Sequence, residues 1–280
     1  MTINLEDRVI LITGAARGLG LAYAQSLHSH GAIVAMHDGG VDQDGANPNP
    51  QLIVDVAKSV GEERTFPVSG LLNSRSECEQ VVQAVLNRYG RIDGLINNAG
   101  IVLWEDTVDV DEDTFRTSSS VNHEAAFWVT QAALKQMRKQ NYGRIVLTTS
   151  SWALSPYPGS KELTLYAQSK GAQFGFAMTL ANGSGHENIR VNLIAPVANT
   201  RIYASEVEPG KLTPESVAGT VTWLVSPECD LSGKLVKAMD GVISVLEITE
   251  AGSMDLGEMA SNPVSCGKAI KDILAGAKTS

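Results

Sequence analysis

The chain has 280 residues, 43% of them hydrophobic and 19% charged, which is the composition of an ordinary globular protein rather than of a disordered one. Its formal net charge of -9 argues against a nucleic-acid surface, because binding phosphates needs clustered Lys and Arg. No run of about 18 apolar residues is present to span a bilayer and the N-terminal residues are too polar for a secretory signal, so we expect a cytoplasmic protein that acts on a small molecule, with no nucleic-acid or membrane partner.

Cysteine and histidine spacing gives no sign of a metal site. Cys78, Cys229 and Cys266 lie far apart and match neither a zinc motif nor a redox pair. Four histidines, His28, His30, His37 and His186, also lack partners at ligand spacing. We therefore predict that no metal is bound.

Short β-branched runs alternate with longer stretches of helical period from Arg8 onward, which is typical of βαβ units and a parallel sheet. The runs predict seven strands, over residues 9–13, 33–37, 64–68, 94–97, 144–149, 190–195 and 235–245. Helices are predicted from the glycines after residue 13 to residue 29, and over 51–60, 74–89, 111–139, 163–181, 214–224 and 267–274.

This alternation predicts an α/β protein with a doubly wound, mainly parallel seven-stranded sheet and helices on both faces. We expect a single domain over residues 1–249. Residues 250–280 are predicted to form a partly helical tail that packs on the domain or on a partner chain. Ligands of doubly wound sheets bind beyond the carboxyl ends of the strands.

A glycine-rich turn with the sequence Thr-Gly-Ala-Ala-Arg-Gly-Leu-Gly occupies residues 13–20, directly after the first predicted strand. Glycines let backbone N–H groups approach a pyrophosphate closely, and the helix that begins there points its N-terminus at the negative charge. The turn therefore predicts a dinucleotide site. Its candidate cofactor contacts are Gly14, Arg17, Gly18, Leu19 and Gly20.

Asp38 ends the second predicted strand, 18 residues beyond Gly20. A carboxylate at this place can accept hydrogen bonds from the adenosine ribose and would repel a 2′-phosphate, so it favours NAD over NADP. Arg17 keeps NADP open, because a basic residue in the turn can also bind a 2′-phosphate.

Tyr166 and Lys170 are separated by four residues, which places a phenol and an ammonium side by side on one helix face. A free phenol has a pKa of about 10 and is a poor base at neutral pH, but a neighbouring cation favours its ionised form. The pair is therefore suited to take a proton from an alcohol.

The glycine spacing, the segment Asn97-Asn98-Ala99-Gly100 and the Tyr-x-x-x-Lys pair together resemble the short-chain dehydrogenase/reductase family. The resemblance covers about residues 5–245. It implies a Rossmann-type fold, a nicotinamide dinucleotide cofactor, an oxidoreductase activity on CH–OH groups, and a homodimer or homotetramer.

The resemblance also implies roles for single residues. It places a catalytic serine at Ser150, with Ser151 as the alternative, and a further catalytic member at Asn122 beside Tyr166 and Lys170. The cofactor contacts implied in the same way are Ser69, Asn98, Ala99, Gly100, Tyr166, Lys170, Pro196 and Thr200.

The segment between Ser150 and Tyr166 is longer than is usual in the family. We interpret the difference as an insertion over residues 156–163 that reshapes the mouth of the pocket. The walls predicted for the substrate pocket are Ser151, Trp152 and Tyr157.

Four segments, at residues 37–40, 142–145, 212–216 and 222–224, are also similar to the (3R)-hydroxyacyl-CoA dehydrogenase portion of peroxisomal multifunctional enzyme type 2. This likeness implies a hydroxyacyl thioester as one candidate substrate. A steroid, a polyol or another secondary alcohol stays open, as does NADPH-dependent reduction of a ketone. The alternative of another class, a non-catalytic nucleotide-sensing protein, would be expected to lack one of Ser150, Tyr166 and Lys170, and all three are present.

Overall fold

The computed structural model describes residues 3–42, 46–154, 161–183, 188–200 and 208–277. Its strands are β1 (Val9–Thr13), β2 (Ile33–Asp38), β3 (Thr65–Ser69), β4 (Gly94–Asn97), β5 (Gly143–Thr148), β6 (Ile189–Val197), β7 (Leu235–Met239) and β8 (Val242–Leu246). Its helices are α1 (Gly18–Ser29), α2 (Gln51–Gly61), α3 (Arg75–Tyr89), α4 (Glu112–Ser119), α5 (Ala125–Gln140), α6 (Thr164–Gly183), α7 (Glu215–Leu224) and α8 (Pro263–Ala277). Short helical segments are η1 (Ser120–Glu124), η2 (Ser151–Ala153), η3 (Lys161–Leu163) and η4 (Gly257–Ser261).

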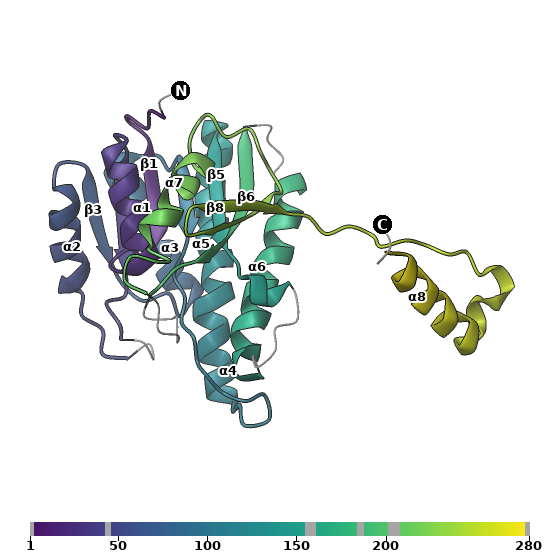
Figure 1. The fold of residues 1–280 in the computed structure, drawn as a ribbon. Helices are drawn as coiled ribbons and strands as arrows, with labels where there is room; N and C mark the ends of the chain where they lie inside the picture. Colours follow the sequence, from purple (N-terminus) through teal and green to yellow (C-terminus); the bar gives the residue numbers. More distant parts are fainter. Residues whose placement is uncertain (1–2, 43–45, 155–160, 184–187, 201–207, 278–280) are drawn as a thin grey trace. The chain divides into compact units, whose positions relative to one another are not determined.

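The strands form one sheet in the order β3-β2-β1-β4-β5-β6-β7-β8 (Figure 1). All pairs from β3 through β7 are parallel. The chain builds outward from β1 first to one side, through β2 and β3, and then to the other side from β4, so the order reverses between β1 and β4. The predicted doubly wound α/β fold is confirmed.

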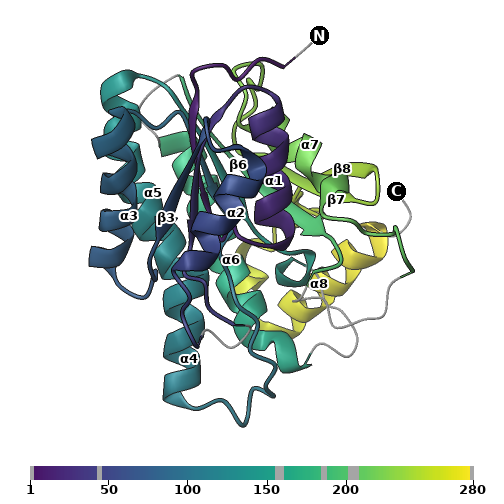
Figure 2. The same ribbon diagram turned by 90° about the vertical axis from the view of Figure 1, so that its left-hand side faces the viewer.

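Helices cover both faces of this sheet (Figure 2). On one face α1 packs against α2 and α7. On the other face α5 packs against α3 and α6, and α6 covers β5 and β6. The two layers shield the central strands from water, as a parallel sheet requires.

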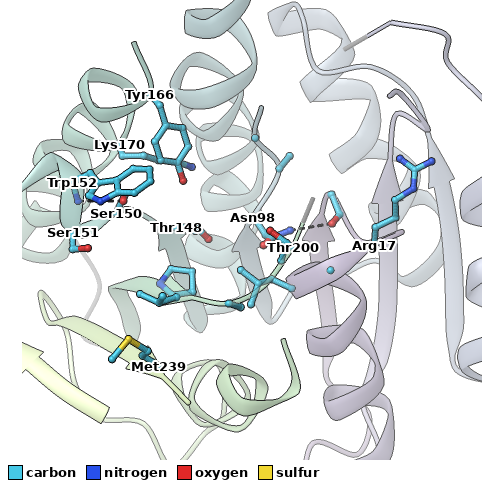
Figure 3. A pocket seen from close by; sticks show the side chains of 18 of the residues that line it. Arg17, Asn98, Thr148, Ser150, Ser151, Trp152, Tyr166, Lys170, Thr200 and Met239 are labelled. Carbon is cyan, nitrogen blue, oxygen red and sulfur yellow. Dashed lines mark hydrogen bonds between the residues drawn. The ribbon is translucent and has the colours of Figure 1, made fainter. Parts of the chain in front are cut away.

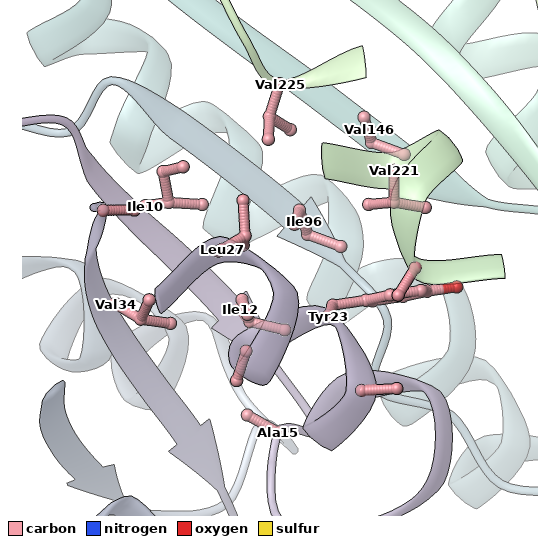
Figure 4. Packing of buried hydrophobic residues seen from close by; sticks show 14 of the residues in the cluster. Ile10, Ile12, Ala15, Tyr23, Leu27, Val34, Ile96, Val146, Val221 and Val225 are labelled. Atoms are coloured by element: carbon pink, nitrogen blue, oxygen red, sulfur yellow. The ribbon is translucent and has the colours of Figure 1, made fainter. Parts of the chain in front are cut away.

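The central strands are fixed by a large apolar core. Every residue of β1 is buried, and its side chains Ile10 and Ile12 join one hydrophobic cluster with Leu27 of α1 and Val221 of α7 (Figure 4). A side chain such as leucine contributes about 1.5–3 kcal/mol when it is fully buried. The packing of α1 and α7 on the sheet therefore holds the carboxyl ends of the strands at one edge.

The sheet has eight strands rather than the predicted seven. The run predicted as one strand over residues 235–245 divides into β7 and β8, because Asp240 and Gly241 adopt positive φ angles of 46° and 83°. Two such residues form the tight turn that joins neighbouring strands of a hairpin. Asp240 also accepts a hydrogen bond of 3.3 Å from the backbone N–H of Leu212, which fixes the turn.

The helix predicted over residues 111–139 is interrupted. Asp111 caps its start by accepting the N–H of Thr114 at 2.7 Å, and α4 then passes through the π-helical segment η1 before α5 begins. A π-helical turn inserts one extra residue, which hydrophobic periodicity does not reveal. The predicted helix over 267–274 is longer in the structure, where α8 occupies Pro263–Ala277.

The chain divides into two compact units, residues 1–245 and 246–280. The second unit contains η4 and α8. Most of its described side chains are exposed, and Ala269 is its one buried residue among them. That this segment packs on the domain or on a partner chain stays a prediction.

No helix in the described part of the chain is both long enough and apolar enough to cross a membrane. The longest, α6, has 20 residues and carries Lys170 near its middle.

A stability prediction comes from Tyr23, whose hydroxyl is buried in the core without a hydrogen-bond partner among the described residues. An unsatisfied buried hydroxyl costs about 1–3 kcal/mol, so Tyr23→Phe should leave the free energy of unfolding unchanged or raise it by about 1 kcal/mol. The matched variant Leu27→Ala, in the same cluster, should lower it by about 2–5 kcal/mol. Urea unfolding measures both, and a large loss in Tyr23→Phe would show that the hydroxyl has a partner.

Candidate active site

A cavity of about 450 Å³ opens at the carboxyl ends of the strands, where the strand order reverses (Figure 3). Its walls come from the turn between β1 and α1, from the ends of β2, β4, β5, β6 and β7, and from α6. It brings together most of the residues predicted from the sequence. These are Gly14, Arg17, Gly18, Leu19, Asp38, Asn98, Ala99, Gly100, Ser150, Ser151, Trp152, Tyr166, Lys170, Pro196 and Thr200.

Three predicted residues lie outside the wall of the cavity. Gly20 lies within α1, where an added Cβ would collide with the carbonyl oxygen of Gly14. Ser69 is exposed at the end of β3, opposite Asp38 in the strand register. Asn122 is buried in η1. Tyr157, predicted as a pocket wall, lies outside the described residues.

The glycine turn has the close packing that a dinucleotide site needs. Gly14 and Gly18 have positive φ angles of 68° and 52°. An added Cβ on Gly14 would lie 2.9 Å from the Cα of Ala99, so only glycine fits there. The amide of Asn98 donates to the carbonyl oxygens of Thr13 and Gly14, at 3.1 and 3.0 Å, and ties the turn to the end of β4. The first N–H groups of α1 have no helical partners, and Gly18 and Leu19 at its start line the cavity.

The end of β2 carries the negative charge of the site. The carboxylate of Asp38 accepts the N–H of Ala16 at 3.0 Å and the N–H of Gly40 at 2.7 Å, which holds it at the cavity wall. Arg17 lies close by, but its guanidinium donates to the carbonyl oxygen of Val41 at 2.9 Å.

Tyr166, Lys170 and Ser150 face the other end of the cavity (Figure 3). The ammonium nitrogen of Lys170 lies 5.4 Å from the centroid of the Tyr166 ring. The hydroxyl of Thr149, at the end of β5, donates to the backbone carbonyl of Lys170 at 2.9 Å, which fixes α6 against the strand that presents Ser150. The ring of Trp152 contacts that of Tyr166 edge to face, with the centroids 6.4 Å apart.

Burial changes the proton affinity of both groups of the pair. It raises the pKa of the Tyr166 phenol to about 12, and it lowers the pKa of the Lys170 ammonium to about 8. Residue spacing reveals only the neighbouring cation, which favours the phenolate. In the structure the loss of water around the phenol outweighs that effect, so the protonated phenol is the favoured form.

Asn122 lies in the interior, close to the pair. Its side chain accepts the N–H of Ile101 at 2.8 Å and donates to the carbonyl oxygen of Ile101 at 3.0 Å. A Cβ on Gly100 would lie 3.0 Å from the side-chain oxygen of Asn122 and 3.5 Å from the ammonium nitrogen of Lys170. Asn122 therefore lies directly behind the cavity wall at Gly100, close to Lys170.

Sequence reasoning missed part of the lining. Val197 and Ala198 directly follow Pro196, so the end of the sixth strand was a signal for them. Lys237 and Met239 belong to β7, and only the alternation of side chains along that strand could have indicated them. The lining residues that were not predicted are Thr148, Val197, Ala198, Lys237 and Met239.

The sequence profile of the family described as "short chain dehydrogenase" matches residues 8–208. The chain belongs to this family. The match includes the glycine turn, the end of β5 and the part of α6 that carries Tyr166 and Lys170. Members of the family normally bind NAD(P)(H).

The chain is similar to peroxisomal multifunctional enzyme type 2 from Mus musculus, with 32% identity over 247 residues, or 87% of this chain and 33% of that protein. It is also similar to the enzyme of that name from Drosophila melanogaster, with 28% identity over 277 residues, or 97% of this chain and 45% of that protein. The predicted likeness is confirmed. The chain spans less than half the length of these two relatives.

Among solved structures, the chain is similar to a short chain dehydrogenase from Mycobacterium avium. The TM-score is 0.83 at 26% sequence identity, and the match covers 97% of this chain and 96% of that one. The likeness therefore extends beyond the residues of the family profile into the C-terminal unit.

The close packing of the glycine turn can be tested by substitution. Gly20→Ala places a Cβ against the carbonyl oxygen of Gly14, so it should distort the turn and lower the affinity for the dinucleotide by at least about tenfold. Gly175→Ala on α6 is the matched control, because an added Cβ there has no neighbour within 4 Å among the described residues. The control should raise the free energy of unfolding by about 0.5–1 kcal/mol and leave dinucleotide binding unchanged.

Fluorescence titration with the reduced dinucleotide measures the affinity, and urea unfolding measures the stability. Equal affinities in Gly20→Ala and Gly175→Ala would contradict the role of the turn.

Proposed function

We propose that the chain is an NAD-dependent oxidoreductase that interconverts a secondary alcohol and a ketone, with Tyr166 as its acid/base. The observation that carries the proposal is the convergence of Tyr166, Lys170 and Ser150 on one cavity with the glycine turn of α1. A nicotinamide dinucleotide bound there supplies the hydride donor or acceptor. The protein has to bind the dinucleotide, orient the substrate oxygen and move one proton.

Ser150 and Tyr166 are the groups that contact the substrate oxygen in this proposal. Both line the cavity, and both carry a hydroxyl that can donate to a carbonyl oxygen. Ser150 takes the orienting role, because its oxygen already accepts the N–H of Trp152 at 3.3 Å, which leaves its proton free for the substrate. Ser151 lines the cavity beside it and is the alternative.

The pKa of Tyr166 connects burial to the chemistry. Because burial raises it to about 12, the phenol is protonated near neutral pH and can donate its proton to the oxygen of a ketone. The reverse reaction needs the phenolate. The ammonium of Lys170 favours that form, since the two groups lie on adjacent turns of α6.

Lys170 also binds the dinucleotide in this proposal, and Asn122 is a positioning residue. The pKa of Lys170, about 8, keeps most of its ammonium charged at neutral pH. Asn122 does not reach the cavity, but it holds the backbone of Ile101 and lies close to Lys170 across Gly100. It therefore acts through Lys170 and through the end of β4.

The preference for NAD rests on Asp38, whose carboxylate faces the end of the cavity beyond the glycine turn. A 2′-phosphate at that end would be repelled by the carboxylate. The alternative, an NADPH-dependent ketone reductase, rests on Arg17, which lines the same end. Ser69 would contact the adenine only if the ring extended beyond Asp38, because Ser69 itself does not line the cavity.

A hydroxyacyl thioester is one candidate substrate, as the likeness of residues 37–40, 142–145, 212–216 and 222–224 to the (3R)-hydroxyacyl-CoA dehydrogenase portion of peroxisomal multifunctional enzyme type 2 implies, and a steroid, a polyol or another secondary alcohol is the alternative. Trp152 supports an apolar substrate wall, because its ring lies between those of Tyr166 and Trp104. Tyr157 keeps its proposed place in this wall.

We also propose a homodimer or homotetramer and a cytoplasmic location. The support for the oligomer is an aromatic groove between α5 and α6, where Phe127 is 39% exposed and its ring lies 5.0 Å from that of Phe176. The relatives from mouse and Drosophila carry the word peroxisomal in their names.

The proposal is tested by following nicotinamide absorbance with a panel of secondary alcohols and ketones, with NAD and NADP in separate assays. Turnover should be faster with NAD. Tyr166→Phe removes the acid/base and should lower kcat by about 10²–10⁴-fold, while the affinity for NADH stays nearly unchanged.

Tyr89→Phe on α3 removes a hydroxyl outside the cavity and should keep full turnover. Near-normal turnover in Tyr166→Phe would show that another group carries the proton. Dinucleotide binding without turnover of any substrate in the wild-type protein would favour a nucleotide-sensing function instead.

A further inference from the structure

Lys237 is a charged residue of the cavity wall that has no part in the proposed chemistry. It lies in the middle of β7, next to Ala195 of β6 in the strand register. Its neighbours in sequence, Val236 and Ala238, point into the core cluster shared with α1 and α7. Lys237 and Met239 therefore point to the opposite face of the sheet, which α6 covers and from which Tyr166 reaches the cavity.

No negative charge lies near Lys237 in the cavity wall. The charged side chains among the described residues that line the cavity are Arg17, Asp38, Lys170 and Lys237. Asp38 is therefore the one acidic side chain of this described lining. Four strands, β1, β4, β5 and β6, separate β2 from β7. At about 4.8 Å between neighbouring strands, Asp38 is about 24 Å from Lys237, far beyond the reach of a lysine side chain. The described part of the chain also offers Lys237 no salt-bridge partner.

The surroundings of Lys237 strengthen its attraction for an anion. Met239 and Val197, which pair in the strand register, and Trp152 line the same cavity with apolar groups. Apolar walls lower the effective dielectric constant, which makes a charge–charge contact stronger than it is in water. An ammonium has three donors and no acceptor, so an anionic oxygen satisfies it best.

The pyrophosphate of the dinucleotide does not fit this role. The glycine turn follows β1, and β4, β5 and β6 separate β1 from β7. The distance from β1 to β7 is therefore about 19 Å, so a phosphate at the N-terminus of α1 lies out of reach of the Lys237 ammonium. Ser150, in contrast, follows β5, only two strand spacings from β7, or about 10 Å. The extended side chain of Lys237 can cover part of the distance between β7 and the end of β5.

We propose that Lys237 binds an anionic group of the substrate, a carboxylate or a phosphate, a few bonds from the carbon that exchanges the hydride. This inference rests on the proposed function. Lys237 is a specificity-determining residue: it selects secondary alcohols and ketones that carry a negative charge over neutral ones of the same size. The chemistry at Tyr166 stays unchanged, because Lys237 binds the part of the substrate that does not react.

The test compares kcat and KM for matched substrate pairs with NAD at saturation. In one pair, 3-hydroxybutyrate is compared with its methyl ester; in the other, 2-hydroxypropyl phosphate is compared with its neutral dimethyl ester. The variants are Lys237→Met, which removes the charge, and Lys237→Arg, which keeps it. Lys58→Met on the exposed face of α2 removes a charge far from the cavity and is the matched control.

The wild-type protein should prefer the anionic member of at least one pair, and the pair concerned tells whether the site takes a carboxylate or a phosphate. Lys237→Met should lower kcat/KM for that substrate by about 10- to 100-fold, mainly through KM, and leave the neutral partner nearly unchanged. Lys237→Arg should keep most of the preference, and Lys58→Met all of it.

The inference is wrong if Lys237→Met lowers kcat/KM equally for the two members of a pair, since Lys237 would then support the fold. It is also wrong if the variant weakens NADH binding in a fluorescence titration, since Lys237 would then contact the cofactor. Turnover of neutral and anionic alcohols at equal rates in the wild-type protein would also overturn it and would leave the proposed function standing. Absence of turnover with every alcohol would overturn both.

Discussion

The burial of the Tyr166–Lys170 pair against the carboxyl edge of the sheet is the constraint on which the rest of the site depends. Lys170 is 2% exposed, and its pKa falls from an ordinary 10.5 to about 8. A shift of this size corresponds to a cost of about 3 kcal/mol for the charged form at neutral pH. The net stability of a domain is about 5–15 kcal/mol, so interactions elsewhere in the structure have to offset this cost.

The groups that hold the backbone around the pair in place have no proposed contact with the substrate. The hydroxyl of Thr149 holds the backbone of α6 at Lys170, and Asn122 holds the backbone of Ile101 after β4. Gly100 lets the two neighbours approach, since a Cβ there would press on Asn122. Of these contacts, the Thr149 hydrogen bond is the one that joins α6 to the end of β5.

The sequence predicted the fold and most of the site because both depend on local patterns. The all-apolar run of β1, the glycines after it and the spacing of Tyr166 and Lys170 are visible in the chain without any knowledge of distant contacts. Parallel strands then bring their carboxyl ends to one edge, so separate motifs meet in one cavity.

What the sequence did not predict depends on three-dimensional surroundings. The π-helical turn at Asn122 and the left-handed turn at Asp240 are changes of one or two residues that periodicity does not register. The rise in the pKa of Tyr166 reflects burial, which residue spacing does not measure. Lys237 is an ordinary lysine in the sequence, and only the order of the strands places it in the cavity.

The pKa of Lys170 in the free protein shows whether this lysine, one helical turn from the phenol, is buried. Carbon-13 NMR of labelled lysines, followed across pH, measures it, and the Lys170→Met variant identifies the resonance by its loss. We expect a midpoint of about 8, well below the ordinary lysine value of 10.5. A midpoint at the ordinary value of 10.5 would show that water reaches the ammonium and that the pair is not buried.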